Sequence, residues 1–166
     1  MGILEKFRNI IQNERTESGN IYSPFDGEVI PLKDIEDGVF SEGMLGKGCG
    51  MKPLKGEVYA PFNGEVILIT PTKHALAIKS NDGIELLIHV GLDTVKMNGK
   101  GFLPSVKVGD RVKCGQSIMK FSISDIEAAG YVTTTAIVVT NSEDYPNELV
   151  LMQGVKGRSE KIMQIS

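Results

Sequence analysis

Short apolar runs separated by turn residues fill the chain from about residue 21 onward. Val66–Ile69 and Ala136–Val139 are examples, and runs of this length match buried strands and are far too short to cross a membrane. Tyr131–Thr140, rich in Thr, Ile and Val, is a further strand candidate. The pattern predicts an all-β fold, which we expect to be an antiparallel β-sandwich or barrel with one or two short helices.

An internal repeat opens this region. Tyr22–Ile30 (YSPFDGEVI) recurs as Tyr59–Ile67 (YAPFNGEVI), with seven of nine positions identical. In each copy a proline precedes an Asp-Gly or Asn-Gly pair and then a β-branched run, which predicts a turn feeding a strand. A third turn is expected in Val106–Gly115, whose spacing of valines and glycines suggests strand, tight turn and strand. Two copies indicate a pseudo-symmetric β domain rather than a long solenoid.

Helical signals are few. Ser124-Asp-Ile-Glu127 reads as a capping box, and Gly130 follows where helices commonly end, so one or two helical turns are expected there. Near the N-terminus, apolar residues recur at helical spacing within residues 2–12, followed by a polar stretch. We therefore divide the chain into an amphipathic, flexible segment (1–20) and one β-sandwich domain (21–166). Residues 2–12 are either a frayed start or an anchor that makes weak contact with a membrane or partner.

The composition of the chain excludes some functions and favours others. The net charge of −3 argues against nucleic-acid binding, which requires a basic surface, and the 19 glycines and 7 prolines fit a turn-rich β fold. No cleavable signal peptide is recognisable at the N-terminus. The two cysteines, Cys49 and Cys114, stand apart from each other and from any ligand cluster, as expected of reduced thiols in a cytoplasmic protein.

The chain contains only two histidines, and both belong to one expected hairpin. His74–Lys79 and Ile84–His89 are strand-like runs separated by Ser80–Gly83, a turn by composition. A turn symmetric about Asn81 and Asp82 places His74 directly opposite His89 on one sheet face. That face would carry His74, Leu76, Leu87 and His89, and the core face would carry Ala75, Ala77, Leu86 and Ile88. A bulged three-residue turn, which the Asp82-Gly83 step also permits, would shift the register by one.

Two adjacent imidazoles suit phosphoryl transfer. A neutral imidazole nitrogen can attack phosphorus, and a second imidazole supplies a hydrogen-bond donor to the phosphoryl oxygens. Thr72, two residues before His74, is placed to orient that ring through its hydroxyl, and Asp93 adds a carboxylate at the rim. The pair therefore predicts that His89 or His74 carries a phosphoryl group with the other as its partner.

The two histidines could also have other roles. A single histidine in a strand is usually structural, but an opposed pair is not typical of structure alone. Zinc could be bound by His74, His89 and Asp93. A structural zinc site, however, requires a fourth ligand, and a β-rich zinc peptidase requires a third histidine. A biotinyl or lipoyl carrier would present a lysine at a hairpin tip among characteristic neighbours, and no such tripeptide occurs. We expect no metal and no cofactor.

Four segments resemble one known family. They are Ser23–Val29, Asp37–Gly48, Pro71–Ala75 and Leu87–Val95 (LIHVGLDTV), and together they resemble the glucose-family enzyme IIA component of the bacterial sugar phosphotransferase system over about Tyr22–Thr140. The resemblance implies an antiparallel β-sandwich that accepts a phosphoryl group from the histidine of the carrier HPr. It implies transfer onward to a cysteine on the IIB domain of a sugar permease.

The resemblance also implies roles for individual residues. His89 matches the histidine phosphorylated on Nε2, His74 its supporting histidine, and Thr72 the residue hydrogen-bonded to that support. The apolar ring around the site matches Val39, Phe40, Met44 and Leu45, and Asp37 and Asp93 match acidic groups that meet basic partner residues. Gly38 and Met44 replace bulkier or branched residues common in the family.

The sequence therefore predicts a phosphotransferase-system phosphocarrier with a phosphohistidine intermediate, acting in the cytoplasm in coupled sugar uptake. Its expected partners are HPr and a IIB domain, and regulatory protein targets are a further class of partner. The alternative is a regulatory docking or metal-binding module of the same fold.

Overall fold

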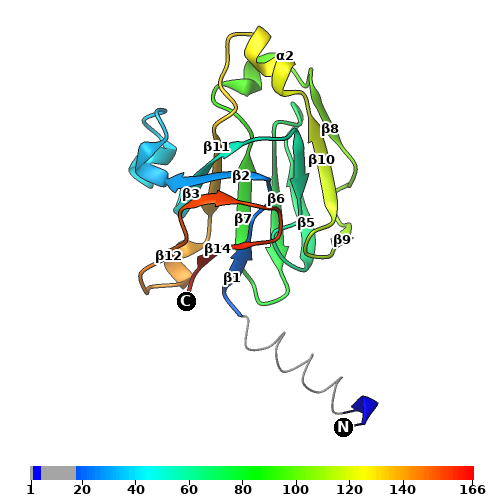
Figure 1. Cartoon of the computed structure of the whole chain (residues 1–166), viewed down its shortest axis with the longest axis vertical. Helices are drawn as coiled ribbons and strands as arrows, with labels where there is room; N and C mark the ends of the chain where they lie inside the picture. Colours follow the sequence, from blue (N-terminus) through cyan, green and yellow to red (C-terminus); the bar gives the residue numbers. More distant parts are fainter. Residues whose placement is uncertain (1, 5–17) are drawn as a thin grey trace.

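The computed structural model describes residues 2–4 and 18–166, which excludes most of the predicted N-terminal amphipathic segment. Residues 18–166 form short strands in three antiparallel sheets (Figure 1). The strands are β1 (Asn20–Tyr22), β2 (Gly27–Pro31), β3 (Lys47–Pro53), β4 (Glu57–Tyr59), β5 (Gly64–Ile69), β6 (Ala75–Ser80), β7 (Glu85–His89), β8 (Phe102–Pro104), β9 (Arg111–Val112), β10 (Ser117–Phe121), β11 (Thr135–Val139), β12 (Val150–Leu151), β13 (Gly154–Lys156) and β14 (Lys161–Gln164). The predicted antiparallel β-sandwich is confirmed. In the described part of the chain, no helix has the length and apolar character needed to span a membrane.

The repeat organises the largest sheet, whose strand order is β13-β2-β3-β11-β7-β6-β5-β9. The first copy of the repeat contributes β2, which pairs with β3 from Gly27 onward. The second copy contributes β5, which pairs with β6 from Gly64 onward. Both glycines are required, because a Cβ atom at either would lie within 2.5 Å of a carbonyl oxygen of the neighbouring strand. The two halves meet at β11 and β7, so the centre of the sheet is also the centre of its pseudo-symmetry.

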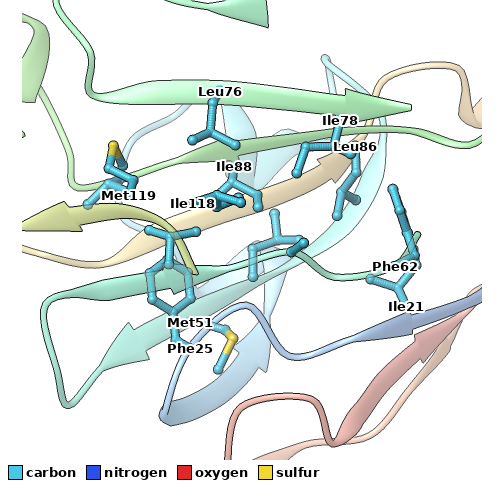
Figure 2. Close-up of a cluster of buried hydrophobic side chains, with 14 of the residues drawn as sticks. Ile21, Phe25, Met51, Phe62, Leu76, Ile78, Leu86, Ile88, Ile118 and Met119 are labelled. Atoms are coloured by element: carbon cyan, nitrogen blue, oxygen red, sulfur yellow. The ribbon is translucent and has the colours of Figure 1, made fainter. Parts of the chain in front are cut away.

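One face of the large sheet and the two smaller sheets enclose the main core (Figure 2). Strands β6 and β7 contribute Leu76, Ile78, Leu86 and Ile88, and Ile118 and Met119 come from β10. All six are fully buried, and each such aliphatic side chain contributes roughly 1.5–3 kcal/mol through burial. A smaller apolar cluster covers the opposite face of the large sheet and is built from Ile35, Phe40, Ala136 and Val138.

The β6–β7 hairpin does not have the symmetric register. Its connection is the three-residue one: the Ser80 amide donates to the Ile84 carbonyl, and Gly83 has a φ of 100°. The Ser80 hydroxyl accepts from the Ile84 amide and donates to Asp82, which fixes this turn. Ala75, not His74, is therefore the residue opposite His89. The prediction of direct pairing is wrong, and the bulged alternative is correct.

The shifted register also changes the faces. Leu76 and Ile78 lie on the core face with Leu86 and Ile88, whereas Leu87 belongs to the cluster on the opposite face. The predicted grouping of Leu76 with Leu87, and of Ala75 and Ala77 with the core, is therefore wrong. A one-residue slip moves every side chain of one strand to the other face.

Three smaller expectations need adjustment. The helix near residue 124 is present as α2 (Ile123–Ala128), but its N-cap is Ser122, whose hydroxyl accepts from the Asp125 amide at 3.1 Å. In Val106–Gly115 the turn is present and Arg111–Val112 is a strand, but no strand precedes that turn within the segment. The strand expected over Tyr131–Thr140 is shorter, at Thr135–Val139.

Candidate functional site

The two histidine rings lie together although their backbones are not paired. Their centroids are 4.7 Å apart and their planes meet at 82°, edge to face. His89 is the last residue of β7, at the centre of the large sheet, with Ala75 on one side and Ala136 on the other. His74 lies one residue before β6 and follows Lys73, whose φ is 62°. The Val90 amide donates to the His74 carbonyl at 2.9 Å, so the backbone pairing continues one residue past β6. The His74 ring also lies 6.5 Å, centroid to centroid, from the ring of Phe102 in the main core.

The tautomer of His89 follows from its hydrogen bond. Its Nδ1 lies 3.0 Å from the carbonyl oxygen of Gly91. A carbonyl only accepts, so Nδ1 carries the proton and donates it. In the neutral ring, Nε2 then holds the lone pair. The ring is thus prepared to act as a nucleophile through Nε2.

His74 is held by a threonine turn. The amide of Lys73 donates to the Thr70 carbonyl, and the Thr72 hydroxyl lies 2.7 Å from Nδ1 of His74. The Thr72–His74 contact predicted from sequence is thus present, although Thr72 lies in a turn and not in a strand. When the Thr72 hydroxyl donates to Nδ1, Nε2 of His74 carries the ring proton and can donate it to another group.

A pocket of about 310 Å³ opens over His89. It is lined by His89 together with Glu36, Asp37, Val39, Phe40, Leu92, Asp93 and Val95. His74 is only 5% exposed and is not among the lining residues, so its ring is buried beside that of His89. The pocket therefore presents one imidazole to a partner.

Four of the six residues predicted for the partner-binding rim line the pocket. Asp37, Val39, Phe40 and Asp93 line it. Met44 and Leu45 do not, and their side chains are 71% and 45% exposed.

Sequence reasoning missed Glu36, Leu92 and Val95. Leu92 and Val95 flank Asp93 in the same run as His89 and could have been found there. The position of Glu36 depends on how the segment before Phe40 folds.

Burial governs the protonation of both rings. Desolvation, with a smaller contribution from His89, lowers the pKa of His74 from 6.5 to about 4. Burial also lowers the pKa of His89, although the Gly91 carbonyl and the carboxylates of Asp37 and Asp93 act in the opposite direction. Both rings are therefore neutral near pH 7. A neutral His89 keeps the lone pair that a nucleophile needs, and a neutral His74 can still donate the proton on its Nε2.

Among residues 2–4 and 18–166, no three His, Cys, Asp or Glu side chains are close enough together to hold a metal ion. Cys49 is buried and Cys114 is exposed, and among the described residues neither forms a disulfide. The ligand set of His74, His89 and Asp93 considered for zinc is thus not assembled.

The low pKa of His74 predicts that acid weakens the fold. The unfolded chain binds a proton at this ring near pH 6.5 and the folded chain only near pH 4, so protonation favours unfolding between these values. We expect this ring to cost about 2 kcal/mol of unfolding free energy between about pH 7.5 and about pH 5. Urea unfolding of the wild type and His74→Gln at both pH values isolates the effect. An equal pH dependence in the two proteins contradicts the assignment.

Comparison with known proteins gives consistent matches. The family model described as phosphoenolpyruvate-dependent sugar phosphotransferase system, EIIA 1, matches residues 19–145. The glucose-specific EIIA component of Oceanobacillus iheyensis is 41% identical over 140 residues, which cover 83% of this chain and 85% of that protein. The solved glucose permease IIA from Mycoplasma capricolum superposes with a TM-score of 0.76 at 28% identity, covering 87% of this chain and 93% of that one.

Longer relatives contain the same unit as one part. The glucose-specific EIICBA component of Staphylococcus saprophyticus is 45% identical over 140 residues, which cover 84% of this chain but 21% of that protein. The β-glucoside-specific EIIBCA component of Bacillus subtilis is 43% identical over 88% of this chain and 24% of its own length. The chain thus spans about a fifth to a quarter of these multi-component relatives.

Proposed function

The chain belongs to the EIIA 1 family of the phosphoenolpyruvate-dependent sugar phosphotransferase system, and on that premise we propose that it carries a phosphoryl group on Nε2 of His89. The donor is the phosphohistidine of HPr and the acceptor is a cysteine on the IIB domain of a sugar permease. The observation that carries the proposal is the histidine pair itself. Nε2 of His89 holds a lone pair beneath an open pocket, and a second neutral imidazole lies beside it.

The transfer balances without a cofactor. The lone pair on Nε2 of His89 attacks phosphorus in line, and a new N–P bond forms as the donor's N–P bond breaks. The electron pair of the broken bond stays on the donor nitrogen, so a donor ring protonated at its other nitrogen leaves as neutral imidazole. Nδ1–H stays bonded to the Gly91 carbonyl, which stabilises the positive charge that develops on the ring. In the second step the acceptor thiolate attacks the same phosphorus and His89 leaves as a neutral ring.

His74 is proposed to stabilise the phosphoryl group. Its neutral ring, oriented by the Thr72 hydroxyl, donates from Nε2 to a phosphoryl oxygen. Because His74 is buried, this donor is already desolvated and needs little reorganisation when charge develops.

The rim is proposed as the docking surface for both partners. Val39 and Phe40 line the pocket, and Met44 and Leu45, a few residues further along the same segment, expose apolar side chains. Their contact with a partner excludes water and limits hydrolysis of the phosphohistidine. Asp37 and Asp93 add negative charge that favours a basic partner surface.

The place of action follows from the partners. HPr and the IIB domain exchange phosphoryl groups in the cytoplasm, so we assign the protein to that compartment. Relatives in which the same unit is part of an EIICBA or EIIBCA component support a IIB domain as the acceptor. Their names include both glucose-specific and β-glucoside-specific components.

Reconstitution tests the proposal. Incubation with phosphoenolpyruvate, enzyme I and HPr is expected to add one alkali-stable phosphoryl group per chain, measured by intact-protein mass spectrometry. Glucose-type and β-glucoside-type IIB domains, added separately, then report the acceptor by loss of that mass. If the protein binds HPr but takes up no phosphoryl group, it is a docking module and the proposal is wrong.

A further inference from the structure

The segment from Glu36 to Leu45 forms one wall of the pocket, and most of its residues are exposed. It projects from the sheets on the left of Figure 1 and contains η2, a single 3-10 turn at Phe40–Glu42. Of these ten residues, Phe40 is the only buried one. A helical turn of this length does not form by itself, so other contacts must fix it.

The carboxylate of Asp37 supplies those contacts. Oδ1 accepts hydrogen bonds from the amides of Val39 and Ser41, both at 3.1 Å, and Oδ2 accepts from the Phe40 amide at 2.9 Å. These amides belong to the start of η2, where backbone donors have no partner within the turn. Burial alone would raise the pKa of Asp37, but the amide donors outweigh it and hold the pKa below its ordinary value.

Phe40 connects this turn to the reactive ring. Its ring centroid lies 5.0 Å from that of His89, with the planes tilted by 56°. The same ring packs in the small apolar cluster with Ile35, Ala136 and Val138. A displaced turn would move Phe40, and His89 would lose one wall of its pocket and part of its desolvation.

We propose that Asp37 is a positioning residue for phosphoryl transfer, whose carboxylate fixes the turn that holds Phe40 against His89. This inference rests on the proposed function of His89. It assigns Asp37 a role within the chain, which its charge toward a basic partner does not require. The family resemblance implies only that partner-facing charge.

Asp93 provides the matched comparison. It lines the same pocket and its carboxylate acts on His89 in the same electrostatic sense as that of Asp37. Within the described residues, however, no hydrogen bond to the Asp93 side chain is found. Asp93→Asn therefore removes a rim charge without releasing a turn, and asparagine tolerates the left-handed conformation of Asp93, whose φ is 60°.

The test separates the cap from the charge with two substitutions of Asp37. Asp37→Glu keeps the charge but misplaces the carboxylate, whereas Asp37→Asn loses the charge but keeps an acceptor oxygen at the same reach. Kinetics with phospho-HPr should show kcat lowered about tenfold in Asp37→Glu and less in Asp37→Asn. Asp93→Asn should raise KM a few-fold, in a salt-dependent way, and lower kcat less than Asp37→Glu does.

Amide hydrogen exchange supplies a readout that does not depend on transfer. Val39, Phe40 and Ser41 should exchange faster in Asp37→Glu than in the wild type, and the core strands should not change. Wild-type transfer rates from Asp37→Glu, or an Asp37→Asn variant more impaired than Asp37→Glu, would overturn the positioning role. Failure of the wild type and Asp93→Asn to take up phosphate would instead refute the proposed function.

Discussion

His89→Ala is expected to take up no phosphoryl group from phospho-HPr, because it removes the only imidazole that lines the pocket. The remaining histidine does not replace it: His74 is 5% exposed and its Nδ1 is already engaged by Thr72. Uptake should fall from one phosphoryl group per chain to none detectable by mass spectrometry or radiolabel. The loss is a change in chemistry and not in affinity, so raising the HPr concentration should not restore uptake.

A folding control accompanies this variant. His89 lies in the central strand β7 beside Phe40, so truncation leaves space in the small apolar cluster. His89→Gln fills more of that space and also lacks the nucleophile, so it should be equally inactive. Urea unfolding should show that both variants fold cooperatively. Uptake of phosphate by either folded variant would show that another residue carries the group.

His74→Ala is expected to separate the two half-reactions. Nε2 of His89 remains available, so the variant should still reach one phosphoryl group per chain on long incubation. Transfer from the phosphorylated variant to the IIB domain should fall by about 10²–10³, the usual cost of removing one aligned donor to a developing anion. Quenched-flow measurement of phosphate leaving the protein gives the rate directly.

His74→Gln is the matched control for that variant. Its amide can donate from roughly the position of the imidazole Nε2, so donation to the IIB domain should recover in part. Equal donation by His74→Ala and the wild type refutes the assigned role. Recovery by glutamine but not by alanine shows that the hydrogen bond matters, since both substitutions remove the ring.

The sequence predicted the residues of the site better than their geometry. The repeat predicted β2 and β5 correctly because proline and glycine restrict the backbone at the same two points of each copy. The hairpin turn allowed two registers, and composition alone could not choose between them. The choice depends on hydrogen bonds of Ser80 and Asp82, including those that Asp82 accepts from the Ser18 hydroxyl and the Gly19 amide.

The two histidine rings lie together although the predicted register was wrong, and the reason lies outside the hairpin. The turn at Thr70–Lys73 comes directly before His74, and its Thr72 hydroxyl lies 2.7 Å from Nδ1 of His74, which orients this ring beside His89. Pairing arithmetic applies only within strands, so it could not anticipate this contact.

The repeat also does not explain why only one half of the large sheet has histidines. Pro53 and Ser80 occupy equivalent places, because they pair with the equivalent glycines Gly27 and Gly64. Six residues before Ser80 is His74, and six residues before Pro53 is Lys47, at the start of β3. The Lys47 ammonium donates to the carbonyls of Tyr145 and Asn147, which connects the segment near residue 145 to β3. These contacts join parts of the chain about 100 residues apart and leave no local pattern in the sequence.

The position of the phosphoryl group in the phosphorylated protein decides whether His89 is the phosphocarrier residue. Phosphorus–nitrogen coupling, measured by NMR on protein with ¹⁵N-labelled histidine, identifies both the residue and the ring nitrogen. We expect a phosphoryl group on Nε2 of His89, with Nδ1 still protonated and hydrogen-bonded to the Gly91 carbonyl. A phosphoryl group on His74, or on Nδ1 of His89, contradicts it.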